Sequence, residues 1–177
     1  MISDKLALLK DFILLHNPYF NQGFDDVILD DSTGYVFNDQ PVFPADNLGN
    51  YFYLRLPNNV TFDYDTIYKT SECASEPGIK SAVILVACMR DADRDKLFLN
   101  LLSTILAFKV ARIKFISGSY QPDAIVSQEL AKIDKSNIEA ALQRLPEDYT
   151  LISITFSLGV NIFPLALNCI QNPCNEC

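Results

Sequence analysis

The chain has 177 residues, of which 49% are hydrophobic and 20% charged, a composition that is typical of a folded globular protein and excludes a disordered one. This length is enough for one domain with a substantial core, and two full domains would be crowded. A net charge of −8 without a basic patch disfavours binding to nucleic acid, and no apolar run reaches the ~18 residues that span a bilayer.

The first predicted element is a helix over residues 3–15. Ser3 can cap its first turn. Its apolar residues fall on one face at helical spacing: Leu6, Leu9 and Ile13. Asn17-Pro18 ends the helix. Acidic residues interrupt this stretch and a basic start is missing, so it does not resemble a secretory signal, and we expect synthesis and use in the cytoplasm.

Residues 19–50 are aromatic, acidic and rich in Gly, Pro and Asn, which predicts a long irregular segment. Residues 25–65 contain eight acidic residues and one basic residue, Arg55, so this region carries −7 of the net charge of −8. Two interpretations stay open: a solvated acidic loop, or a surface that guides a polyanion or docks a basic partner. The candidate acidic surface consists of Asp25, Asp26, Asp30, Asp31, Asp39 and Asp46.

The same segment has too many apolar residues for a permanently solvated linker. Ordering it costs about 1–2 kcal/mol per residue in backbone entropy, which contacts must offset. We therefore predict that contact, chiefly with a neighbouring subunit, orders it. Phe37 and Phe43 are its candidate interface residues.

Residues 51–56 and 60–69 read as two strands around the turn signal Pro57-Asn58-Asn59, which suggests a hairpin. The run 81–88 (SAVILVAC) is short and almost continuously apolar. Such a run is typical of a central strand that is covered on both faces.

Asp91 and Asp93 can cap a helix that runs to about residue 108. This helix is apolar nearly all round, which exceeds what one sheet can cover. Its second surface must be covered by the rest of the fold or by a neighbouring subunit. The candidate interface residues of this helix are Leu99, Leu102 and Phe108.

Three further elements complete the chain. Residues 110–116 alternate as a strand, and residues 124–130 form a short strand or a helical turn. Ser136 and Glu139 form a capping box for a helix that runs through Leu145 and is stopped by Pro146. Residues 149–158 alternate apolar with hydroxyl side chains, which predicts a strand that buries one face only.

The order of these elements predicts an α+β fold, a small mostly antiparallel sheet with helices packed on one face. Residues 1–160 form the single domain. Residues 161–177 form a tail.

The sequence contains little that supports catalysis. His16 is the single histidine, and phosphate-binding glycine motifs are absent. Asp63 and Asp65 with Lys69 loosely match a metal-dependent nuclease site, an interpretation that stays open as the weakest one. We predict no enzymatic activity and no cofactor.

The cysteines do not form a metal-binding set. Cys88 lies in an apolar run and reads as a core residue. Cys169, Cys174 and Cys177 lack the fourth ligand that structural zinc requires, so we expect free thiols and no structural metal.

Two stretches carry a family resemblance: residues 79–116 (IKSAVILVACMRDADRDKLFLNLLSTILAFKVARIKFI) and the ending DAIVSQEL…IEAALQRLPEDYTLISITFSL. With the first helix and the hairpin before them, they resemble the neck and tail-terminator proteins of tailed bacteriophages, in particular those of crAss-like phages. The resemblance covers residues 3–15 and 51–158 and is one of element order and pattern. No family residue is carried over by position.

The resemblance implies a structural virion protein that closes into a ring of six or twelve copies and is assembled in the host cytoplasm. Its partners would be further copies of itself and neighbouring neck, portal or tail proteins, with no membrane. DNA would pass through the channel without sequence-specific binding. The alternative is a cytoplasmic adaptor or immunity-type binding module whose acidic segment docks on a basic partner.

Overall fold

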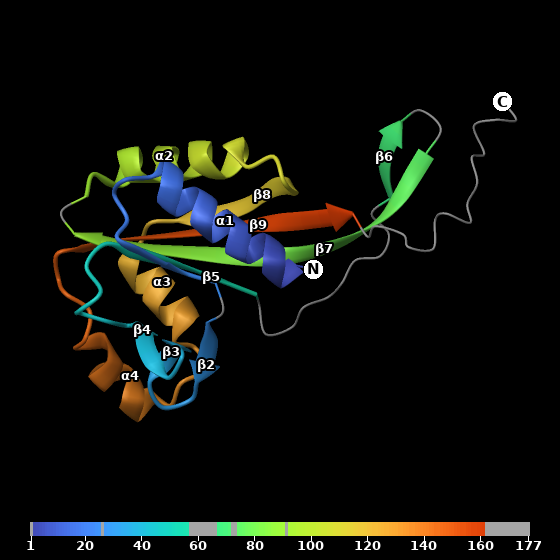
Figure 1. The fold of residues 1–177 in the computed structure, drawn as a ribbon. Coiled ribbons are helices and arrows are strands. Elements are labelled where there is room, and N and C mark those ends of the chain that lie inside the picture. The colour runs from blue at the N-terminus through green and yellow to red at the C-terminus, as the bar shows by residue number, and fades with distance from the viewer. Residues whose placement is uncertain (1, 26, 57–66, 72–73, 91, 162–177) are drawn as a thin grey trace, which may run out of the picture.

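The computed structural model describes residues 2–25, 27–56, 67–71, 74–90 and 92–161, which form three layers around a central sheet (Figure 1). The strands of this sheet, in spatial order, are β1 (Gln22–Phe24), β5 (Tyr51–Arg55), β7 (Ala74–Arg90), β9 (Tyr149–Asn161) and β8 (Arg112–Ser119). β1 pairs with β5 in parallel and the other pairs are antiparallel. β1 and β8 are therefore the two edges of this sheet.

The central strand β7 is covered on both faces, as its apolar run predicts. Val83, Leu85 and Ala87 belong to the core on one side of the sheet. Ile84, Val86 and Cys88 belong to the core on the other side. The prediction for this strand is confirmed.

The first core lies between the sheet and two helices, α1 (Ile2–His16) and α2 (Arg94–Ala107). Asp93 caps α2, because its side chain accepts hydrogen bonds from the backbone N–H groups of Asp95 and Lys96. Ser3 lies inside α1 and not before it, so its predicted capping role is wrong.

The second core lies on the opposite face. It is covered by α3 (Pro122–Glu129), by α4 (Lys135–Leu142), and by a small antiparallel sheet of β2 (Ile28–Asp30), β3 (Gly34–Phe37) and β4 (Gln40–Phe43). The α+β class is confirmed. The prediction that helices pack on one face is wrong, since the central sheet is apolar on both faces and each face needs a cover.

The segment 19–50 is not irregular throughout, because it contains strands β1 to β4. Tyr35, Val42 and Phe43 are buried against the second core of the same chain. The prediction that a neighbouring subunit orders this segment is therefore wrong. Its aromatic residues pack on their own domain and supply the contacts that offset the entropy of ordering.

Two pairing predictions also change. β5 pairs with β1 and β7, whereas β6 (Ile67–Ser71) pairs with the first residues of β7, so the predicted hairpin of residues 51–69 is not formed. In Figure 1, β6 and the start of β7 extend away from the layers. Ser153 and Ser157 of β9 are buried, so this strand is covered on both faces and not on one.

At the start of α4, the capping side chain is that of Asp134, and not the predicted pair of Ser136 and Glu139. The Oδ1 atom of Asp134 accepts hydrogen bonds from the backbone N–H and the hydroxyl of Ser136. The sequence left two alternatives for residues 124–130, a short strand or a helical turn. Most of these residues lie in helix α3.

Candidate functional site

The outer face of α2 and the adjacent edge strand β8 expose an unusual amount of apolar surface. Five of the ten large hydrophobic residues that are exposed in the described chain lie between residues 97 and 122. They are Leu99, Leu106, Val110, Ile116 and Tyr120. Apolar side chains that gather in this way are typical of a contact surface for another molecule.

The helical period explains why leucines of α2 face outward. Leu97, Leu101 and Ile105 are buried against the sheet. Leu99 and Leu106 lie on the opposite side of the helix, and they are 62% and 52% exposed.

The position of α2 on β8 is fixed by aromatic contacts. The ring of Phe98 packs edge-on against Tyr120 at a centroid distance of 6.1 Å, and the Arg94 guanidinium lies 5.6 Å from the Tyr120 ring centroid. A side chain at Gly118 would collide with the Phe98 ring at 2.8 Å. The helix and the edge strand therefore form one rigid surface.

The edge strand β8 and the connection before it carry positive charge, whereas the first turn of α2 carries the exposed Asp95. The sequence between residues 97 and 122 contains three bases, Lys109, Arg112 and Lys114, and no acid. All three side chains are exposed. Ile113 and Phe115 of β8 pack toward α2, so the alternation of the strand turns Arg112 and Lys114 toward the layer of α3.

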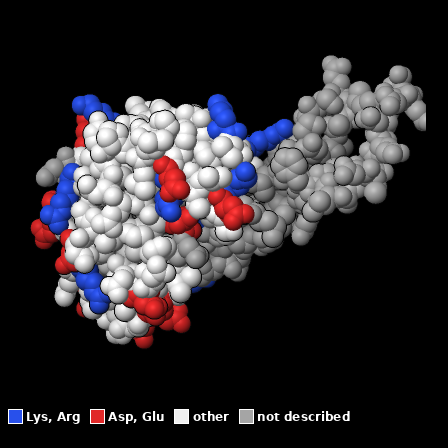
Figure 2. All heavy atoms as spheres, viewed as in Figure 1, with Lys and Arg blue, Asp and Glu red and all other residues white. Residues whose placement is uncertain are grey.

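The opposite edge of the sheet carries the reverse charge. Residues 17–54 contain six acids and neither Lys nor Arg. Asp31, Asp39 and Asp46 are exposed. In Figure 2, acidic side chains gather at the lower end of the view, over the small sheet.

Two of the remaining acids have structural roles. Asp25 is partly buried and forms an ion pair with Lys10 at 3.3 Å. The Oδ1 atom of Asp30 accepts hydrogen bonds from the backbone and hydroxyl groups of Ser32 and Thr33, which close the turn between β2 and β3. These bonds, those of the Ser32 and Thr33 hydroxyls first, lower the pKa of Asp30 to about 2. Asp26 lies outside the described residues.

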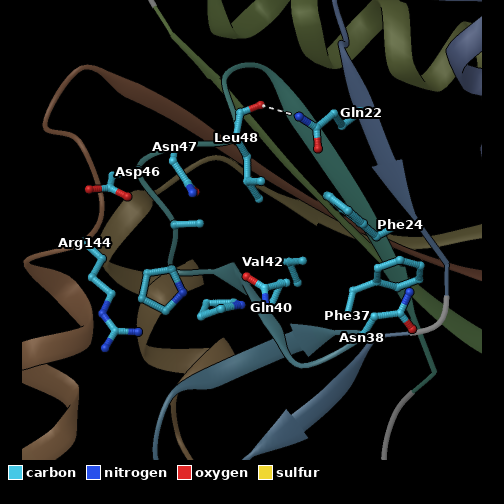
Figure 3. A pocket seen from close by; sticks show the side chains of 13 residues that line it. Gln22, Phe24, Phe37, Asn38, Gln40, Val42, Asp46, Asn47, Leu48 and Arg144 are labelled. Atoms are coloured by element: carbon cyan, nitrogen blue, oxygen red, sulfur yellow. Dashed lines mark hydrogen bonds between the residues drawn. The ribbon is translucent and has the colours of Figure 1, made fainter.

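A groove of about 570 Å³ lies beside β1, between the central sheet and the small sheet (Figure 3). Its apolar lining includes Phe24, Phe37, Val42 and Leu48. Figure 3 shows Asp46 and Arg144 together at one side of the groove and Phe24 with Phe37 at the other. The side-chain amide of Gln22 donates a hydrogen bond of 3.4 Å to the Leu48 carbonyl and holds the rim in place.

The candidate interface residues divide into two groups. Leu99 is exposed, and Leu102 and Phe37 are half-buried, so these three remain available in part for contact. Phe108 and Phe43 are 3% and 0% exposed, because each fills the core of its own chain. Their assignment to an intermolecular interface is therefore wrong.

A buried polar network that the sequence reading did not identify links β5 to α3. Arg55 donates two hydrogen bonds to Glu129, from Nε at 2.7 Å and from the terminal nitrogen at 2.6 Å. The Tyr53 hydroxyl donates a third bond of 2.9 Å to the same carboxylate. Burial, followed by the nearby Glu129 charge, raises the pKa of Tyr53 well above its usual range and that of Tyr35 to about 12.

This network is satisfied within the chain and has the character of a structural lock. Arg55 also lies 5.0 Å from the centroid of the Tyr35 ring. One feature of the sequence could have indicated this network, the single Arg in the apolar run of residues 51–56. A charged side chain in such a run is buried only when it has a partner of opposite charge.

Within the described ranges, no three His, Cys, Asp or Glu side chains come together as a metal site would require. His16 is exposed and packs on the Phe12 ring, with centroids 4.3 Å apart. Asp63, Asp65 and the cysteines at positions 73, 169, 174 and 177 lie outside the described residues. Among the helices that are described, none is long and apolar enough to cross a membrane.

Comparisons with known proteins found no protein-family model that matches the chain and no curated protein that is similar to it.

Proposed function

We propose that this protein is a structural subunit of a bacteriophage virion. In this role, six or twelve copies close into a ring at the neck, between head and tail, around the channel for DNA. The observation that carries this proposal is the exposed leucine face of α2 beside β8, the edge strand among the described strands, because apolar surface exposed in this way is typical of a contact with another molecule.

The charge of the chain suits a wall past which DNA moves. Counterion release requires lysine and arginine contacts to phosphates, and a chain with a net charge of −8 offers few of them. A ring of such subunits would surround DNA without holding it. Neighbouring portal, neck or tail proteins would contact the two open faces of the ring.

The replacement of Leu99 by Arg tests this proposal. Leu99 is 62% exposed, so the variant should fold with a free energy of unfolding within about 0.5 kcal/mol of the parent. A buried positive charge at a subunit contact should abolish the large species in analytical ultracentrifugation. The matched control is Leu142→Arg on α4, a residue that is 40% exposed and lies outside the α2 and β8 surface. Unchanged assembly of the Leu99→Arg variant would contradict the proposed surface.

The second candidate is a cytoplasmic adaptor or immunity-type module that docks on a basic partner. It is favoured by one observation, the exposed Asp31, Asp39 and Asp46 on a stretch without bases. An adaptor would stay monomeric at high concentration until its partner is added, whereas a ring subunit assembles alone.

A further inference from the structure

The two edges of the central sheet carry opposite charge. Residues 97–122, which include the β8 edge, hold three bases and no acid, and residues 17–54, which include the β1 edge, hold six acids and no base. These segments are far apart in one molecule because β5, β7 and β9 lie between the edge strands. They can meet only between two molecules.

The charges decide the symmetry of such a contact. In a two-fold contact through β8, Lys109, Arg112 and Lys114 would face their own copies and repel. A two-fold contact through β1 would bring aspartates together in the same way. A head-to-tail contact pairs bases with acids, and head-to-tail contacts produce rings when the rotation closes.

We infer that the lateral contact between subunits joins the basic β8 edge of one copy to the acidic, groove-bearing β1 edge of the next copy. This inference rests on the proposed ring and specifies its interface. The occupant of the groove in Figure 3 is thus a second copy of this chain.

The apolar parts of the two edges also match. Val110, in the connection between α2 and β8, is 53% exposed and is flanked by Lys109 and Arg112. The groove offers an apolar lining that includes Phe24 and Leu48, with Asp46 at its side and the exposed Asp39 next to it. Val110, with basic residues on either side, is therefore complementary to an apolar groove that has acidic residues beside it.

The placement of the charges within the layers agrees with this pairing. Arg112 and Lys114 are turned toward the layer of α3, and the groove lies in the same layer at the other edge. A shift of one molecule along the sheet therefore brings them together without turning the sheet over. Among the described residues, Arg144 is the base that lines the groove, and it lies beside Asp46.

Charge-reversed variants test the contact. Variant one combines Lys109→Glu with Lys114→Glu, and variant two combines Asp46→Lys with Asp39→Asn. Asn is chosen at position 39 because the backbone there has a φ of 62°, which Asn tolerates. Lys132→Glu with Lys135→Glu, and Glu139→Lys with Glu147→Gln, change the charge equally at exposed sites elsewhere.

Each test variant alone should weaken self-association on the order of 100-fold at low salt, while the control pairs assemble like the parent. A mixture of the two test variants should assemble again, because the intact edges pair with each other and the two altered edges, now acidic on variant one and basic on variant two, pair at the alternate contacts of the ring. The readout is the sedimentation profile, with circular dichroism to confirm that each variant is folded.

The outcomes separate this inference from the proposed function. If the parent assembles but either test variant assembles equally well, or if the mixture is not restored, the head-to-tail contact is wrong and the ring proposal stands. If variant one fails and variant two assembles normally, the β8 edge takes part in the contact but the β1 edge does not, and its partner surface lies elsewhere on the neighbouring copy. If the parent itself stays monomeric, the ring proposal fails and this inference fails with it.

Discussion

Arg55 and Glu129, which are separated by 74 positions in the sequence, form a buried ion pair with two parallel hydrogen bonds of 2.6 and 2.7 Å. Their side chains are 8% and 1% exposed. The pair attaches α3 to β5 beneath the central sheet, so it fixes the layer that also contains the groove. Two parallel bonds hold both the distance and the orientation of the helix.

Removal of one partner from this pair should destabilise the fold strongly. We predict that Glu129→Ala lowers the free energy of unfolding by about 3–5 kcal/mol, because Arg55 is left as an uncompensated buried charge. Denaturant unfolding provides the measurement. Joint replacement with Arg55→Met and Glu129→Leu should cost less than either single change, since no charge remains buried. The control Glu139→Ala, at an exposed position of α4, should stay within about 0.5 kcal/mol. A decrease in the free energy of unfolding of less than about 1 kcal/mol for Glu129→Ala would contradict a stabilising role of the Arg55–Glu129 pair.

The turn at Asp30 should give the fold an acid-sensitive contribution. Hydrogen bonds from Ser32 and Thr33 lower the pKa of Asp30 from 3.8 to about 2 in the folded chain. A lowered folded pKa stabilises the fold above the unfolded value of 3.8, and this stabilisation is lost as pH falls through 2. We predict that Asp30→Asn is less stable than the parent at pH 6 and that the difference shrinks between pH 4 and 2. An NMR titration of the carboxyl checks the value directly. A midpoint near 3.8 would exclude this contribution.

Gly34 should tolerate no side chain. Its φ is +98°, and a Cβ there would collide with the backbone carbonyl oxygen of Phe43. Gly34→Ala should therefore destabilise the chain by at least about 2 kcal/mol in denaturant unfolding, because a backbone atom must move. Gly49→Ala is the matched control. Gly49 also has a positive φ, of 67°, but the nearest atom to a Cβ there would be Asn21 Oδ1, at 3.5 Å. Equal losses for the two variants would show that the backbone angle alone, and not the collision, determines the cost.

Cys88 should be chemically inert in the folded protein. Burial raises the pKa of its thiol to about 12, so the reactive thiolate is scarce at pH 8. We predict that iodoacetamide labels Cys88 only after denaturant is added, as read by peptide mass spectrometry. Labelling of Cys88 in the native protein at the rate of a free thiol would show that the second core opens readily.

The long elements could be predicted from the sequence because their patterns extend over many residues. The run 81–88 has no polar face, and a strand of this kind must be covered on both sides, as β7 is. The helix α2 was recognised from Asp93 and from its apolar content. The same content correctly indicated a surplus apolar face, of which Leu99 and Leu106 are the exposed part.

The short and distant features could not be predicted in the same way. Strands of three or four residues, such as Ile28–Asp30, are too short for a visible alternation. Ser153 and Ser157 read as a solvent face, but small hydroxyl side chains also fit under a packed layer. The Arg55–Glu129 pair depends on tertiary structure, and only the isolated Arg within an apolar run indicated it. The basic edge of residues 97–122 was visible as a stretch without acids, yet its meaning depends on the place of β8 in the sheet.

The central claim is that the chain assembles by itself into a closed ring. Native mass measurement of the purified protein, with two-dimensional class averages from electron micrographs, tests this most directly. A ring subunit should give a single species of six or twelve copies with rotational symmetry and a central opening. Its self-association should weaken as salt rises, because opposite charges meet at each contact. A folded monomer at micromolar concentration and low salt would contradict it.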